Sequence, residues 1–127
     1  MVTAIILVIT IAISLYGFSN ESFQRKLLFN PYLSQRPGEY YRFISSGFIH
    51  GGILHLAFNA LVLFSFGAPV ERAYSAVHGP IKGTILYALL YLGALAFSEV
   101  GTFAKYLNNP AYNSLGASGA VSAVIFA

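Results

Sequence analysis

The chain has 127 residues, of which 57% are hydrophobic and only 9% are charged, and its formal net charge is +3. A soluble domain carries about 25% charged residues, so this composition excludes a water-facing surface and predicts a polytopic membrane protein. The chain has no cysteine, which excludes disulfides and thiolate chemistry, and no aspartate, which excludes a Ser-His-Asp triad built from this chain. The few basic residues are spread along the chain and do not indicate nucleic-acid binding.

The first apolar run covers residues 2–18 and has no charged side chain, which places it at the short end for a membrane span. A signal peptide is the alternative, but no Lys or Arg precedes the run and no A-x-A-like cleavage site follows it. Residues 19–49 form a long connection, rich in aromatic side chains that are typical of the membrane–water interface. Arg42 lies between two of these aromatics, and we expect it to anchor the connection at that interface.

The second span is predicted over residues 50–69, and polar residues occupy one side of it. His55, Asn59, Leu63, Gly67 and Glu71 recur every four residues, which places them on one helical face. Polar side chains inside a membrane helix are costly, and two interpretations stay open at this point. They form a functional site, or they make hydrogen bonds that hold helices together.

The third span is predicted over residues 83–103. The last apolar segment, residues 116–127, covers about 18 Å as a helix, whereas the hydrocarbon core is about 30 Å thick. It predicts the start of a fourth span in a fragment of a longer protein, and a re-entrant helix is the alternative. The predicted fold is an all-α, polytopic transmembrane helical bundle, with residues 1–127 forming the N-terminal part of a single membrane domain.

A serine lies near the start of this last segment, in the sequence Gly116-Ala117-Ser118-Gly119. Backbone N–H groups in the first turn of a helix have no intrahelical partner and attract negative charge, and such donors stabilise an oxyanion. Ser118 is therefore a candidate nucleophile, and close packing of helices through small residues is the alternative. His50 and His55 do not form a metal site, because five residues turn a helix by about 140°. No cofactor is expected.

Taken together, the three motifs of the chain resemble the rhomboid family of intramembrane serine proteases over residues 41–127. The motifs are His50-x4-His55-x3-Asn59, Gly67-x3-Glu71 and Gly116-x-Ser118-Gly119. The resemblance implies a rhomboid-like bundle in the lipid bilayer that cleaves transmembrane protein substrates. Tyr41 stands where the family often has a tryptophan, next to the matching Arg42.

The resemblance also implies a role for each matching residue. Ser118 would be the nucleophile, and His55 and Asn59 would form the oxyanion hole with the backbone N–H of Ser118. His50 would support them by hydrogen bonding. The remaining matches are expected to be supporting residues: Gly116, Gly119, Arg42 and Glu71.

Rhomboid proteases pair the serine with a histidine from a later helix, and this chain has no matching histidine. His78 follows the second span, where we expect the opposite membrane face, and His55 is assigned to the oxyanion hole. We therefore predict a Ser-His dyad protease whose histidine is absent from this fragment, so that the 127-residue chain is inactive alone. A catalytically inactive, client-binding relative and a small transporter or channel subunit are the alternatives.

The two indicators of membrane orientation disagree. The first and third connections carry more Lys and Arg than the second, and this charge distribution places the long loop inside the cell. The family resemblance places that loop outside, on the side of the active site, and we follow the resemblance. The expected location is the bacterial plasma membrane.

Overall fold

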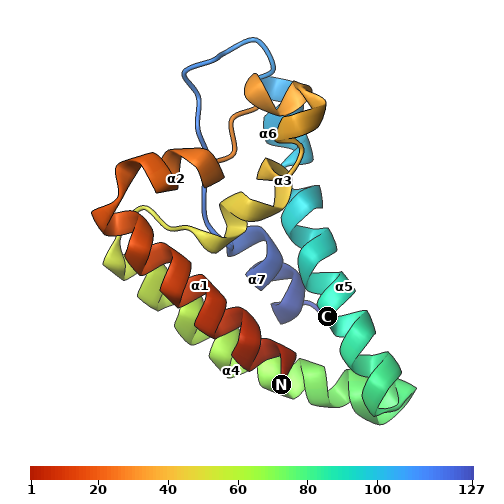
Figure 1. Cartoon of the computed structure of the whole chain (residues 1–127). Helices are drawn as coiled ribbons and strands as arrows, with labels where there is room; N and C mark the ends of the chain where they lie inside the picture. The colour runs from red at the N-terminus through yellow and green to blue at the C-terminus, as the bar shows by residue number, and fades with distance from the viewer.

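The computed structural model describes residues 1–127 as helices joined by loops, without a β-sheet (Figure 1). Three segments are long and apolar enough to cross a membrane, namely Val2–Ser19, Ile53–His78 and Pro80–Lys105. The predicted all-α, polytopic membrane fold is therefore confirmed. The α-helices are α1 (Val2–Ser19), α2 (Glu21–Leu27), α3 (Arg42–Ser45), α4 (Ile53–His78), α5 (Pro80–Ser98), α6 (Val100–Lys105) and α7 (Ser118–Ile125), and the 3-10 turns are η1 (Leu33–Gln35), η2 (Pro37–Glu39) and η3 (Ser46–Phe48).

The long helices form a V that encloses the short helix α7 (Figure 1). Helices α4 and α5 join at Gly79, whose positive φ of 90° suits glycine at a sharp reversal. Close packing follows the turn, because a Cβ added to Gly83 would lie 2.4 Å from the carbonyl oxygen of Tyr74. Helix α1 runs along α4, and α7 packs between α4 and α5.

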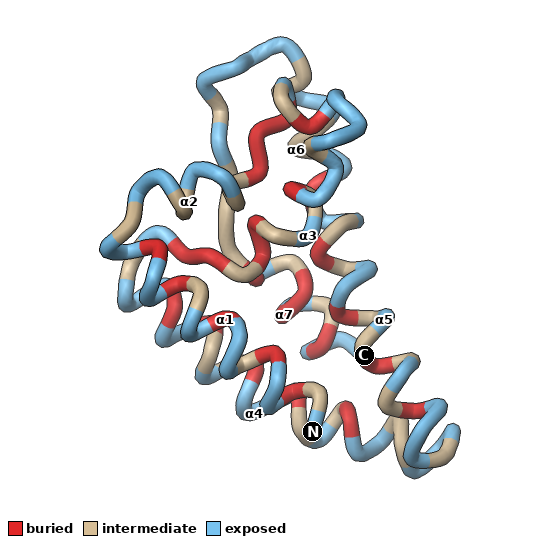
Figure 2. Tube along the Cα trace, in the orientation of Figure 1, coloured by how far each residue is buried: buried red, intermediate tan, exposed pale blue.

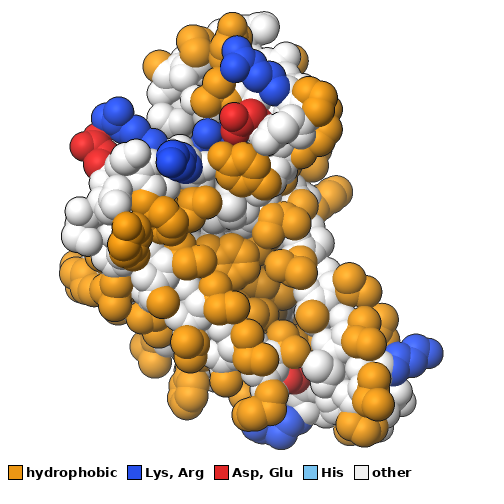
Figure 3. Space-filling model, viewed as in Figure 1, with side chains coloured by type: hydrophobic (Ala, Val, Ile, Leu, Met, Phe, Trp, Pro, Cys, Tyr) orange, Lys and Arg blue, Asp and Glu red, His pale blue; other side chains and the backbone are white.

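The core lies where α7 meets the other helices. Ala117, Ala120, Val121 and Val124 contribute its α7 side. They pack against an apolar set from α1, α4 and α5, namely Ile6, Leu63, Tyr87, Tyr91 and Leu95. Figure 2 shows buried residues on the sides of the helices that face one another, and Figure 3 shows hydrophobic side chains over much of the face in view. An apolar exterior of this kind suits a bundle surrounded by lipid.

The helix bounds differ from the predicted spans at several ends. Helix α4 begins at Ile53 rather than at residue 50, α5 ends at Ser98 rather than at residue 103, and α7 covers Ser118–Ile125 rather than residues 116–127. Two further differences involve proline. The second span was expected to end at Pro69, but α4 continues through this proline to His78. Proline removes one helical hydrogen bond, a loss that packing against neighbouring helices offsets in membrane proteins. Helix α5 begins at Pro80 rather than at residue 83, because proline is favoured at the first helical position. Hydropathy alone predicts neither the continuation of α4 through Pro69 nor the start of α5 at Pro80.

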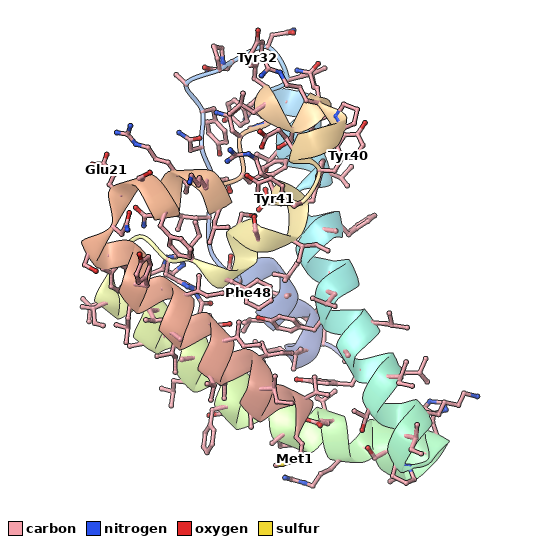
Figure 4. The ribbon with its side chains drawn as sticks, in the orientation of Figure 1. Met1, Glu21, Tyr32, Tyr40, Tyr41 and Phe48 are labelled. Atoms are coloured by element: carbon pink, nitrogen blue, oxygen red, sulfur yellow. The ribbon has the colours of Figure 1, made fainter.

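The first connection is more structured than a loop. Residues 19–49 contain α2, α3 and the three 3-10 turns, and they form a knob at one end of the bundle (Figure 4). Tyr32, Tyr40 and Tyr41 lie on this knob with exposed side chains. The prediction that these aromatics meet the membrane–water interface stays a prediction.

Candidate active site

Ser118 is the first residue of α7, and its exposed hydroxyl makes no hydrogen bond within the chain. The N–H groups of its own helical turn are free of intrahelical partners. The hydroxyl and these donors therefore lie on the same helical turn. The segment that leads into α7 fixes where Ser118 lies.

Gly116 brings this segment against His55 of α4. Gly116 has a φ of 105°, a conformation that favours glycine. A Cβ at this position would lie 2.8 Å from Cε1 and 3.2 Å from Nε2 of His55. The imidazole of His55 thus occupies the space beside the backbone two residues before Ser118. Two motifs that are distant in sequence meet at this point.

His50 is fully buried beside His55 and connects three parts of the chain. The two imidazole rings meet edge to face, with centroids 4.9 Å apart. The N–H of Ala117 donates to Nε2 of His50 at 3.4 Å, so the ring proton is on Nδ1 and donates to Ser14 Oγ at 3.1 Å. Ser14 then donates to the carbonyl of Phe48 at 3.0 Å. His50 therefore links α1 to the residue that precedes Ser118.

This hydrogen-bond pattern requires a neutral imidazole. Burial, and to a smaller extent the neighbouring His55, lowers the pKa of His50 to about 4. At neutral pH the ring therefore keeps one donor and one acceptor. A protonated ring would have a second donor and could not accept from Ala117.

Asn59 lies one turn after His55 and is buried. Its side-chain amide donates to the carbonyl of His55 at 3.2 Å, so it bonds within its own helix rather than to a neighbouring helix. The predicted ridge is confirmed in part, since Asn59, Leu63, Gly67 and Glu71 lie on the buried face of α4, whereas its first member, His55, is exposed.

The far end of this ridge holds α1 in place. Glu71 accepts hydrogen bonds from the N–H groups of Val2 and Thr3, at 2.7 and 2.8 Å, and it also pairs with the terminal ammonium of Met1. Glu71 lies 16 residues beyond His55, about 24 Å along the helix. It therefore supports the helical scaffold and does not contact the reacting groups. His78 is farther still, about 35 Å from His55 along α4.

Gly119 allows α7 to approach α5 closely. A Cβ at this position would lie 2.4 Å from Cβ of Ser98, a separation that atoms do not tolerate. The glycine that follows Ser118 thus seats the first turn of α7 on α5. Small residues next to the serine serve helix packing as well as the candidate site, so the two sequence-based interpretations are compatible.

Arg42 was expected to be an interfacial anchor, and this expectation is wrong. Arg42 is 7% exposed. Its guanidinium donates to the carbonyls of Arg25 and Leu28, at 2.9 and 2.7 Å, and it pairs with Glu39 at 2.7 Å. A guanidinium has several donors in a fixed fork, so one side chain can close the turns of the first connection. Flanking aromatics gave no sign of this internal role.

The contacts that hold the segment before α7 were not predicted from the sequence. Phe29 and Ser114 exchange backbone hydrogen bonds of 2.9 Å in both directions, and the N–H of Gly116 donates to Ser46 at 2.9 Å. The Asn30 amide donates to the carbonyl of Pro110 at 3.0 Å. Most of these are backbone contacts between distant segments, which leave no pattern of residue types in the sequence.

Comparison with known proteins identifies the family. The rhomboid domain family matches residues 37–127. The chain is 40% identical over 84 residues to the rhomboid protease GluP of Bacillus subtilis, covering 66% of this chain and 14% of that protein. It is 31% identical over 103 residues to the rhomboid protease AarA of Providencia stuartii, covering 75% and 35%.

A further relative aligns with almost the whole chain. This is the rhomboid protease GlpG of Haemophilus influenzae, 30% identical over 125 residues that cover 98% of this chain and 57% of that protein. The chain thus spans between 14% and 57% of the length of these three relatives. No solved structure matches. The domain match over most of the chain, together with the serine and histidine motifs at one site, shows that this chain belongs to the rhomboid family.

Proposed function

We propose that the protein containing this chain is an intramembrane serine endopeptidase that cleaves transmembrane protein substrates, with Ser118 as the nucleophile. The observation that carries the proposal is the contact between Gly116 and His55. It sets an imidazole beside the start of the helix on which the exposed Ser118 hydroxyl lies. The relatives named rhomboid proteases support the same assignment.

In the proposed reaction, Ser118 Oγ attacks the carbonyl carbon of a peptide bond while a base takes the hydroxyl proton. The carbonyl oxygen becomes an oxyanion, which the N–H of Ser118 and the side chains of His55 and Asn59 would stabilise. Removing one such donor lowers kcat by about 10²–10³ in other serine proteases. The C–N bond then breaks, the amine receives the proton from the base, and water hydrolyses the acyl-enzyme.

None of the chain's histidines is suited to be the base. His50 uses both of its ring nitrogens in hydrogen bonds to Ala117 and Ser14. His78 lies about 35 Å from His55 along α4. His55 is assigned to the oxyanion. We therefore propose that the second member of the Ser-His dyad lies outside residues 1–127, and that this chain alone does not hydrolyse peptide bonds.

The test uses the protein that contains this chain, reconstituted in liposomes with a fluorogenic transmembrane reporter. We expect Ser118→Ala to lower cleavage by at least about a thousandfold. Ser122→Ala is the matched control, because Ser122 is exposed on the same helix one turn later, and it should retain activity.

Two results would contradict parts of this proposal. If the longer protein neither cleaves the reporter nor reacts with a fluorophosphonate probe, it is not a serine protease, and an inactive client-binding role or a transport role becomes the better hypothesis. If the 127-residue chain cleaves the reporter and loses activity on Ser118→Ala, the argument about the missing base is wrong. We further propose the bacterial plasma membrane as its location, since these relatives are bacterial proteins.

A further inference from the structure

A large groove lies at the end of the bundle where α4 turns into α5, away from Ser118. Its volume is about 980 Å³, at the upper end of the range for small-molecule sites. The walls come from the first two turns of α1, the second half of α4 and the start of α5. Met1, which Figure 4 labels, marks the end of the groove at the α1 N-terminus. The proposed protease activity does not use this region.

Exposed apolar side chains line part of the groove. Val8 of α1 and Phe64 of α4 line it and are 68% and 66% exposed, while the small side chains of Ala4 and Ala68 leave the space between them open. Arg72, which lines the groove, lies 17 residues after His55, about 26 Å along the helix. The polar end of the groove is therefore distant from the candidate active site.

One end of the groove offers free hydrogen-bond donors. Arg72 lines this end, forms no ion pair and makes no hydrogen bond. The Ser75 hydroxyl beside it is also unpartnered. The neighbouring Glu71 carboxylate is already occupied by the terminal ammonium of Met1 and by the N–H groups of Val2 and Thr3. An uncompensated cation and a hydroxyl thus lie at the polar end of an apolar groove, and this end of the groove is near the ends of the spanning helices.

We propose that this groove binds one anionic phospholipid. Its phosphate would accept hydrogen bonds from Arg72 and Ser75, and an acyl chain would lie along the apolar wall between Val8 and Phe64. Basic pockets between membrane helices are known to suit anionic headgroups. The charge argues for an anionic rather than a neutral lipid, because the free guanidinium has no counter-ion within the chain.

The test titrates the 127-residue chain in mild detergent with phosphatidylglycerol or phosphatidylcholine of identical acyl chains, and native mass spectrometry counts the bound lipids. We expect one saturable phosphatidylglycerol site with about fivefold higher affinity than for phosphatidylcholine, as one basic residue near a membrane surface provides. Arg72→Gln should remove this preference. Lys82→Gln, the matched control, removes the same charge at the same end of the bundle but outside the groove, and should keep it.

A second variant tests the groove without changing its charge. Ala4→Phe places a large side chain in the groove from an exposed position of α1, and it should weaken the binding of both lipids. Equal affinities for the two lipids in the unmodified chain would overturn the proposal, as would an equal loss of preference in Lys82→Gln. A dimer that dissociates on Ala4→Phe would show that a second copy occupies the groove. Competition by inorganic phosphate alone would show a phosphate site instead of a lipid site.

Discussion

Replacing Gly116 by alanine tests how the segment before α7 positions the candidate oxyanion hole. The φ of 105° at this residue is unfavourable for alanine, and strain of this kind costs about 1–3 kcal/mol. The new Cβ would also meet Cε1 of His55 at 2.8 Å. The His55 side chain is exposed and the atom in conflict is at its far end, so the ring can rotate away. The strain therefore determines the loss of stability, and the displaced ring determines the loss of activity.

Two measurements separate these effects. Unfolding of the 127-residue chain in SDS mixed micelles, followed by its nine tyrosines, should show that Gly116→Ala lowers the free energy of unfolding by about 1–3 kcal/mol. Gly93→Ala is the control, because nothing lies within 4 Å of its added Cβ in α5. It should be neutral or stabilising by about 0.5–1 kcal/mol, since alanine favours a helix more than glycine does.

The proposed protease activity gives the second measurement. Gly116→Ala should lower cleavage by about 10²–10³, the loss expected for one oxyanion donor. In a His55→Ala background the same substitution should lower activity little further, although its effect on stability remains. A Gly116→Ala chain as stable as the unmodified one would refute the strain argument. If Gly116→Ala lowers activity by the same factor in the His55→Ala background as in the unmodified protein, the displacement of the His55 ring is not the cause of the activity loss.

Three further predictions concern the scaffold. Gly83→Ala should destabilise the chain by about 1–3 kcal/mol, because its Cβ would meet a backbone carbonyl of α4 that cannot rotate away; SDS unfolding measures this, and Gly101→Ala, where space is open, should cost nothing. Neutral His50 should stabilise the chain above pH 6.5, and this stabilisation should be lost as pH falls toward 4, because the unfolded chain takes up the proton first; His50→Gln should abolish this dependence. Asn30→Leu should raise hydrogen exchange across residues 107–115 about fivefold or more, and an unchanged exchange rate would contradict the bracing role of Asn30.

The sequence predicted those features that depend on local composition or spacing. Apolar runs of membrane length identify spans directly, and the four-residue repeat from Asn59 to Glu71 marks the buried face of α4, although His55, which begins the repeat, is exposed. The contact between the histidine motif and the serine motif was expected from the family resemblance. Helix periodicity alone cannot bring two distant segments together.

The missed features depend on tertiary packing. Pro69 is typical of a helix end, yet α4 continues past it. The part of α4 that follows packs against α1, because Glu71, two residues after Pro69, accepts hydrogen bonds from the first N–H groups of α1. Its aromatic neighbours suggested that Arg42 is an interfacial residue. Its guanidinium instead binds the carbonyl of Arg25 in α2 and the carbonyl of Leu28, which directly follows α2. Each of these outcomes is decided by a partner far along the chain, and single-residue propensities carry no information about that partner.

The His50 network explains why the N-terminal third of the chain matters for a serine near residue 118. Ser14 is on α1, Phe48 ends the turn η3, and Ala117 precedes the candidate nucleophile. The neutral imidazole of His50 bonds to Ser14 and Ala117, and Ser14 bonds to Phe48. A side chain with donors only would leave the Ala117 N–H unpaired, and a buried unpaired N–H costs about 1–3 kcal/mol. The imidazole must therefore keep its Nδ1 proton and stay uncharged. The hydrogen bonds of His50 thus connect α1 to the residue before Ser118, and we expect the first helix to help set the position of Ser118 without contacting it.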